Sequence, residues 1–110
     1  MTAEPGTERA MPTTETATAS VLLTHAVGLR ARPSVKLTKV AKGFSARIEL
    51  AVAADGPWID AKSIVKVMAA KAPKDTVLHF RAEGADADRA VQALVELVER
   101  DFPEGAGERP

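Results

Sequence analysis

Three stretches of the chain carry apolar residues at the spacing of an amphipathic helix. The first has apolar side chains at positions i, i+3, i+4 and i+7, namely Leu37, Val40, Ala41 and Phe44. Pro33 suits its first turn and Gly43 its end, so we predict a helix over 31–42. The same spacing predicts a longer helix over 86–101, from Val91, Leu94, Val95 and Val98. It also predicts a short helix around Ile64, Val67 and Met68.

Alternation of apolar and polar residues predicts the strands. The clearest example runs from Ala46 to Val52, and a second lies at 76–82, where Leu78, Phe80 and Ala82 alternate with Val77, His79 and Arg81. Short β-type runs at 21–24 and 58–59 bring the predicted strands to four.

The predicted elements follow the order β-α-β-β-α-β-α, which is typical of an α+β sandwich whose helices cover one face of a sheet. Residues 1–19 are rich in Thr, Ala, Glu and Pro and have too few large apolar residues to fold, so we predict a disordered tail. The predicted domain spans 20–102, and 103–110 form a flexible C-terminal tail.

Composition excludes several classes of protein. With 110 residues there is room for one domain, and without cysteine there is no disulfide framework, thiolate metal site or cysteine nucleophile. The 15 basic and 15 acidic residues balance, which argues against a nucleic-acid partner. No stretch resembles a membrane span or a signal peptide, so we expect a cytoplasmic protein without membrane insertion. We also expect a monomer with no metal and no cofactor.

The charges are unevenly distributed along the chain. Residues 26–82 hold 11 basic and 4 acidic side chains, whereas 83–110 hold 3 basic and 8 acidic ones. Arg30 and Arg32 lie at the predicted start of the first long helix, where unbonded N–H groups favour an anion. This end of the helix is therefore a candidate phosphate site. The run of Lys36, Lys39 and Lys42 is expected to form a solvated face.

The segment 28–34, Gly-Leu-Arg-Ala-Arg-Pro-Ser, resembles the signature Gly-Leu-His-Ala/Thr-Arg-Pro-Ala of the HPr family. These are small phosphocarriers of the bacterial phosphoenolpyruvate-dependent sugar phosphotransferase system. The similarity continues, in the family's order, at 60–68 and 82–95. The resemblance implies an open-faced β-sandwich, in which a four-stranded antiparallel sheet carries three helices on one face. It also implies relay of a phosphoryl group from enzyme I to enzyme IIA-type proteins.

Arg30 stands where the resemblance places the phospho-accepting histidine. A guanidinium stays protonated and offers no lone pair, so direct relay through Arg30 is not expected. Arg32 is similar to the family arginine that stabilises the phosphoryl oxygens, and with Ala31 it is predicted to bind phosphate without transferring it. His25 is a weak substitute acceptor, because nothing in the sequence fixes its ring. His79 is interpreted as a structural histidine on a strand.

Ser63 carries the second part of the resemblance. Its place before the short helix predicts an N-cap, and the family likeness implies phosphorylation there by an HPr kinase. The likeness also implies that Ile64, Val65 and Met68 dock partners. Residues 70–72, Ala-Lys-Ala, replace the family's common Leu-Gly-Leu, so the helix is expected to end differently.

Three functions stay open at this point. The first is a phosphocarrier of a phosphotransferase system, the second a regulatory paralogue that acts through Ser63 without relay, and the third an anion-binding interaction module. An enzyme in its own right is not indicated, because the chain has no nucleophile elbow and no glycine-rich nucleotide loop.

Overall fold

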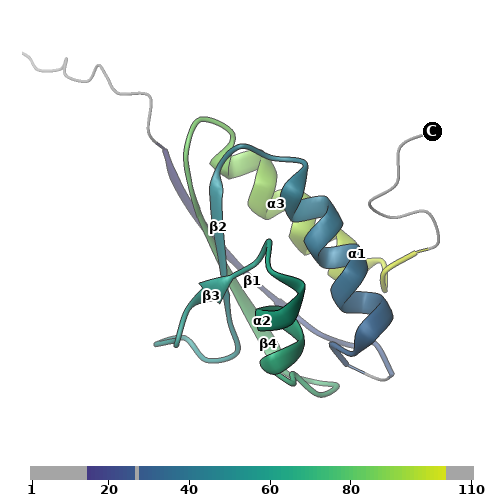
Figure 1. Cartoon of the computed structure of the whole chain (residues 1–110). Coiled ribbons are helices and arrows are strands. Elements are labelled where there is room, and N and C mark those ends of the chain that lie inside the picture. Colours follow the sequence, from purple (N-terminus) through teal and green to yellow (C-terminus); the bar gives the residue numbers. More distant parts are fainter. Residues whose placement is uncertain (1–14, 27, 104–110) are drawn as a thin grey trace, which may run out of the picture.

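The computed structural model describes residues 15–26 and 28–103. These residues form four strands and three helices in the predicted order (Figure 1). The strands are β1 (Thr16–Leu22), β2 (Arg47–Ala51), β3 (Ile59–Asp60) and β4 (Val77–Glu83). The helices are α1 (Ala31–Lys42), α2 (Ile64–Ala69) and α3 (Ala87–Glu99).

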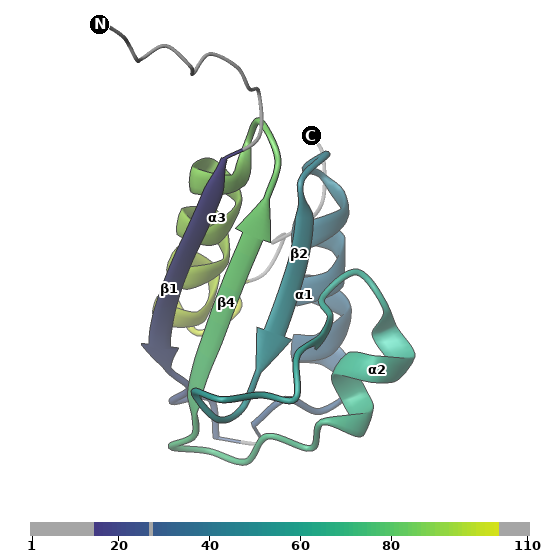
Figure 2. The same ribbon diagram turned by 90° about the vertical axis from the view of Figure 1, so that its left-hand side faces the viewer.

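The strands form one antiparallel sheet in the order β1-β4-β2-β3. Its central strand β4 pairs with β1 and with β2, so that His79 faces Ser20 on one side and Ala51 on the other. Figure 2 shows α1 and α3 behind the sheet, while α2 lies beyond β2. Among the described residues, no helix covers the other face of the sheet, which confirms the expected open-faced sandwich.

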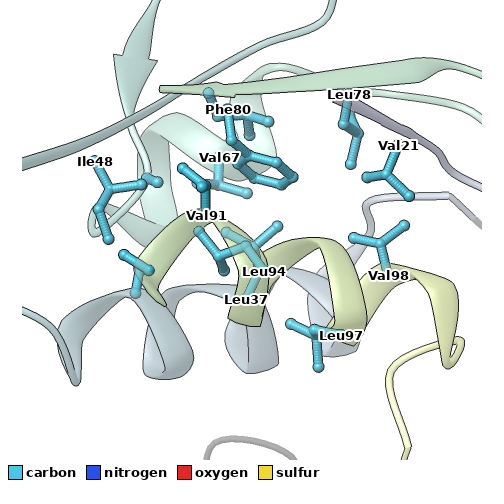
Figure 3. Packing of buried hydrophobic residues seen from close by; sticks show 14 of the residues in the cluster. Val21, Leu37, Ile48, Val67, Leu78, Phe80, Val91, Leu94, Leu97 and Val98 are labelled. Atoms are coloured by element: carbon cyan, nitrogen blue, oxygen red, sulfur yellow. The ribbon is translucent and has the colours of Figure 1, made fainter. Parts of the chain in front are cut away.

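The core lies between the sheet and the helices (Figure 3). As the alternation predicts, Leu78, Phe80 and Ala82 of β4 point into it and are buried. The apolar stripes of the long helices complete it from the other side, with Leu37 and Leu94 fully buried. Burial of these side chains is the main favourable contribution to folding.

Several element boundaries differ from the sequence-based expectation. β1 begins at Thr16, not Val21, so residues 16–19 of the predicted tail belong to the sheet. They do so because Ala17 and Ala19 pack against the core and every β1 residue pairs with β4. Their small side chains conceal this alternation in the sequence. Residues 1–14 and 104–110, where tails are predicted, lie outside the described residues.

The acidic residue at the start of α3, Asp86, binds a neighbouring turn. The Asp86 carboxylate does not cap its own helix; it accepts hydrogen bonds from the backbone N–H groups of Ser45 (2.9 Å) and Ala46 (2.8 Å). These bonds, that from Ser45 above all, hold the pKa of Asp86 below its usual value. The contact ties the turn after α1 to the start of α3.

Within the described residues, no helix is long and apolar enough to cross a membrane.

Candidate functional site

The N-terminus of α1 is built by a tight turn at Gly28. Gly28 has φ +69°, and a Cβ at this position would lie 2.4 Å from the Ala72 carbonyl oxygen, so glycine is required there. The next residue, Leu29, donates its N–H to the same oxygen at 2.8 Å. The turn therefore fixes the first residues of α1 against the chain that follows α2.

Arg30 occupies the N-cap position of α1 without capping the helix. Its backbone is extended and its carbonyl accepts from the N–H of Ser34 at 2.9 Å, but no side chain caps the helix. Within the described residues, the N–H groups of Ala31 and Arg32 have no acceptor, and Pro33 has no N–H at all. Two backbone donors thus remain at the positive end of a 12-residue helix dipole.

A hollow of about 440 Å³ opens at this helix end. Three of its lining residues are cations, Arg30, Arg32 and Lys36, and no acid contributes to it. The remaining lining residues are His25, Ala31, Pro33 and Phe102. Guanidinium groups and helix N–H groups are the donors that proteins use for phosphate oxygens, so the hollow suits a phosphate-sized anion.

The segment that follows α3 closes one side of this hollow through Phe102, which no local pattern in the sequence predicts. Asp101 and Phe102 both adopt left-handed backbone conformations (φ 62° and 53°), which turn the chain back after α3. The Lys36 Nζ donates to the carbonyl oxygens of Phe102 (2.9 Å) and Pro103 (3.2 Å). The expectation that Lys36 belongs to a solvated face is therefore wrong: its ammonium binds backbone carbonyls far along the chain.

His25 also lies in this hollow. Its ring meets the buried ring of Phe102 edge to face, with centroids 5.6 Å apart. The sequence showed nothing that would fix the His25 ring because its contact comes from a residue 77 positions later. His79, in contrast, lies in β4 away from the hollow, as expected for a structural histidine.

Ser63 begins α2 and caps it, as predicted. Its Oγ accepts from the N–H of Lys66 at 3.3 Å, and its carbonyl accepts from Val67 at 2.9 Å. Lys66 is exposed, whereas Lys62 donates from Nζ to the Phe44 carbonyl at 2.8 Å. The Ser63 hydroxyl is half-buried at the surface, with one lysine beside it that makes no ion pair within the described residues.

The expected docking residues on α2 differ in exposure. Val65 is 74% exposed and Met68 41%, while Ile64 is half-buried and Val67 is fully buried. Ile64, Val67 and Met68 have the spacing of one helix face, but of these three only Val67 is fully buried. The helix ends at Ala69 with Ala70 as its C-cap, and Lys71 follows with φ 53°. Val65 and Met68 therefore offer an apolar surface.

A second hollow, of about 1030 Å³, lies between the start of α1 and the end of α2. Arg30 and Ala31 line it from α1 and Met68 lines it from α2, while Lys71 and Lys74 add positive charge. Arg30 borders both hollows. Arg30 and Met68 thus lie on one surface with cations around an apolar centre, and Ser63 does not line it.

Within the described residues, no group of three His, Asp or Glu side chains lies close enough to hold a metal ion.

Known proteins match this chain over most of its length. The family model described as the PTS HPr component phosphorylation site matches residues 17–100. A phosphocarrier protein HPr from Pseudomonas aeruginosa is 35% identical over 85 residues, which cover 77% of this chain and 93% of that protein. A multiphosphoryl transfer protein from Vibrio cholerae is 38% identical over 89 residues, or 80% of this chain, but the chain spans only 22% of that relative.

Solved structures show the same fold. HPr-C-His from Thermoanaerobacter tengcongensis superposes with a TM-score of 0.72 at 31% identity, covering 86% of this chain and 99% of that one. A phosphocarrier protein HPr from Bacillus anthracis gives a TM-score of 0.70 at 30% identity, covering 76% and 96%.

Proposed function

The chain belongs to the HPr family of phosphotransferase-system components, and we propose that it acts there as a regulatory member that docks partners without relaying phosphoryl groups. The observation that carries this proposal is Arg30 at the start of α1, the position that the family signature gives to the phospho-accepting histidine. Relay needs a nitrogen lone pair that attacks phosphorus and later leaves it. A guanidinium has none at working pH.

In this proposal, the hollow at the start of α1 binds phosphate but does not transfer it. Arg30 and Arg32 provide charge, and the N–H groups of Ala31 and Arg32 point donors at the anion. The ligand is a free phosphate or the phosphoryl group of a docked partner.

Ser63 is the proposed regulatory site. Phosphorylation by an HPr kinase would place a dianion beside Lys66, in front of Val65 and Met68. The added charge would change which partners accept the apolar surface of α2. The proposed partners are enzyme I and enzyme IIA-type proteins, and the proposed location is the cytoplasm.

One observation favours a second candidate function, which is relay through His25. This imidazole lines the same hollow as Arg30 and Arg32, and Phe102 packs against its ring. A neutral imidazole nitrogen is a competent phosphoryl acceptor, so the chain would then be a phosphocarrier with a relocated acceptor.

Two incubations separate these functions, one with phosphoenolpyruvate and enzyme I, the other with ATP and an HPr kinase. Intact mass and peptide mapping then locate any phosphate. We expect phosphate on Ser63 in the second incubation and none in the first. The matched control is Arg30→His, which should gain acid-labile phosphate from enzyme I.

Each other outcome replaces the proposal with a named alternative. Acid-labile phosphate on the unaltered chain that His25→Ala removes would establish relay through His25. No label on the unaltered chain in either incubation would leave an anion-binding module, which a phosphate titration followed by amide chemical shifts would then detect at Ala31 and Arg32.

A further inference from the structure

The two edges of the sheet differ in length and protection. β3 has two residues, whereas β1 presents seven, Thr-Ala-Thr-Ala-Ser-Val-Leu, with no charge and no proline. Proteins usually protect a long edge strand with lysine, proline or a bulge, because its outer N–H and C=O groups can pair with another strand. β1 has none of these protections.

The hydrogen bonds at both ends of β1 show which groups point outward. The Glu15 carbonyl accepts from Gly84 and the Leu23 N–H donates to Thr76, both at 2.8 Å. In an antiparallel ladder, alternate residues bond to the same neighbour, so the odd-numbered residues face β4. The N–H and C=O groups of the even-numbered residues therefore point away from the sheet: Thr16, Thr18, Ser20 and Leu22.

The helix behind this edge carries charges of opposite sign at its two ends. A hollow of about 540 Å³ lies between Ala19 of β1 and α3. Arg89 lines it near the start of α3, and Glu96 and Glu99 line it near the end. Within the described part of the chain, the side chains of Arg89 and Glu99 form no hydrogen bond or ion pair, and Glu96 contacts only Arg100, at 3.8 Å.

We propose that two copies of this chain associate through β1, strand against antiparallel strand, and join their sheets into one. In Figure 2, α3 lies behind β1 and β4. A second copy fits this edge because a two-fold axis near Ala19 would also set the two α3 helices side by side in opposite directions. Arg89 of one copy then lies beside Glu96 and Glu99 of the other, and the same contact repeats across the axis. An unrelated extended peptide would satisfy the edge but not these charges.

The proposed association differs from the monomer expected from the sequence, in which strand order and the direction of the outer N–H groups are not visible. It also leaves the proposed functional surface accessible. In Figure 2, β1 is at one side of the sheet, and α2 is at the opposite side. Failure of this inference would therefore leave the proposed function untouched.

Hydrogen exchange of the full chain, measured by NMR at increasing protein concentration, tests the pairing with an internal control. Amides of Thr18 and Ser20 should exchange fast when dilute and become at least about tenfold slower when the dimer is populated. Amides of Ala17 and Ala19, which face β4, should be slow throughout. Unchanged exchange at Thr18 and Ser20 up to about 1 mM, a concentration at which even weak pairs associate, would overturn the inference.

Sedimentation velocity of charge variants tests whether the partner is a second copy of the chain in this orientation. Arg89→Glu should raise the dimer dissociation constant about tenfold, since it makes both cross-axis contacts repulsive. Adding Glu96→Arg to that variant should restore most of the affinity, which only a second copy in this orientation explains. Thr18→Pro, which removes one outward N–H, should abolish association; Ser20→Lys repeats this test if Thr18→Pro does not fold. A dimer insensitive to all these changes, or a chain that stays monomeric, would refute the proposal.

Discussion

The helices α1 and α2 pack against each other, but their first residues satisfy the helix in opposite ways. At α2, the Ser63 hydroxyl accepts a backbone N–H of its own helix. At α1, Arg30 provides no acceptor, and the N–H groups of Ala31 and Arg32 stay available. The start of α2 thus has a side-chain cap, whereas the start of α1 has none, and we propose that an external anion binds there instead.

The largest expected effect concerns the turn that presents the start of α1. Gly28→Ala forces a side chain into a left-handed residue and against the Ala72 carbonyl, so the free energy of unfolding should fall by at least about 2 kcal/mol. Urea unfolding measures it. The control is Gly43→Ala, where φ is −74° and the nearest atom lies 3.3 Å away; a loss there as large as at Gly28 would contradict this account.

Removing the cap of α2 should have a smaller effect. Ser63→Ala leaves the Lys66 N–H without its side-chain acceptor and should lower the free energy of unfolding by about 1 kcal/mol. Ser63→Asp keeps an acceptor and should unfold at nearly the same urea concentration as the unaltered chain. Equal losses in both variants would show that the hydroxyl does not act as a cap.

Adding a cap to α1 should raise the free energy of unfolding instead of lowering it. Arg30→Ser places an acceptor at the start of α1 and should raise the free energy of unfolding by about 0.5 kcal/mol. The gain is small because Pro33 has no N–H, which leaves Arg32 as the donor within reach. Arg30→Ala is the control and should show no gain in the same urea titration.

Anion binding distinguishes the two helix starts directly. Inorganic phosphate should shift the amide resonances of Ala31 and Arg32, with little change at Lys66, whose N–H already has an acceptor. Chloride at equal ionic strength controls for screening. Equal shifts at both helix starts, or none at α1, would remove the distinction between them.

The start of α3 differs from both other helix starts because its stabilising contact, made by the Asp86 carboxylate, depends on pH. Hydrogen bonds from Ser45 and Ala46 lower the pKa of Asp86, so its contribution to stability is present above the ordinary pKa of 3.8 and is lost as the pH falls through the lower, folded value. Asp86→Asn should flatten the acid side of the stability profile, measured by thermal unfolding from pH 7 to about pH 2. An unchanged profile would mean that this carboxylate is not part of the acid response.

Local patterns determined most of the fold. The alternation at Leu78, Phe80 and Ala82 and the helical spacing at Leu94 and Val98 depend on residues a few positions apart, and burial follows them directly. The start of β1 could not be predicted from the local pattern, because Thr and Ala differ too little in hydrophobicity to distinguish its two faces.

Some features of the candidate site could be predicted from the sequence, and others could not. Arg30 and Ser63 each lie at the start of a helix that the sequence predicts, so their positions were determined by local residues alone. The contacts of Lys36 with the Phe102 carbonyl and of His25 with the Phe102 ring join positions 66 and 77 residues apart. No local period encodes such contacts.

By itself, the sequence determined the type of each main element, the inward faces, and the residues at the helix starts, since each depends on neighbours within a turn or a strand. Other features follow only from the assembled fold. His25 shares a hollow with Arg30, and the segment after α3 closes that hollow. β1 lies at the edge of the sheet with its even-numbered N–H groups outward. Those features depend on strand order and helix packing, which are set by the burial of the whole core.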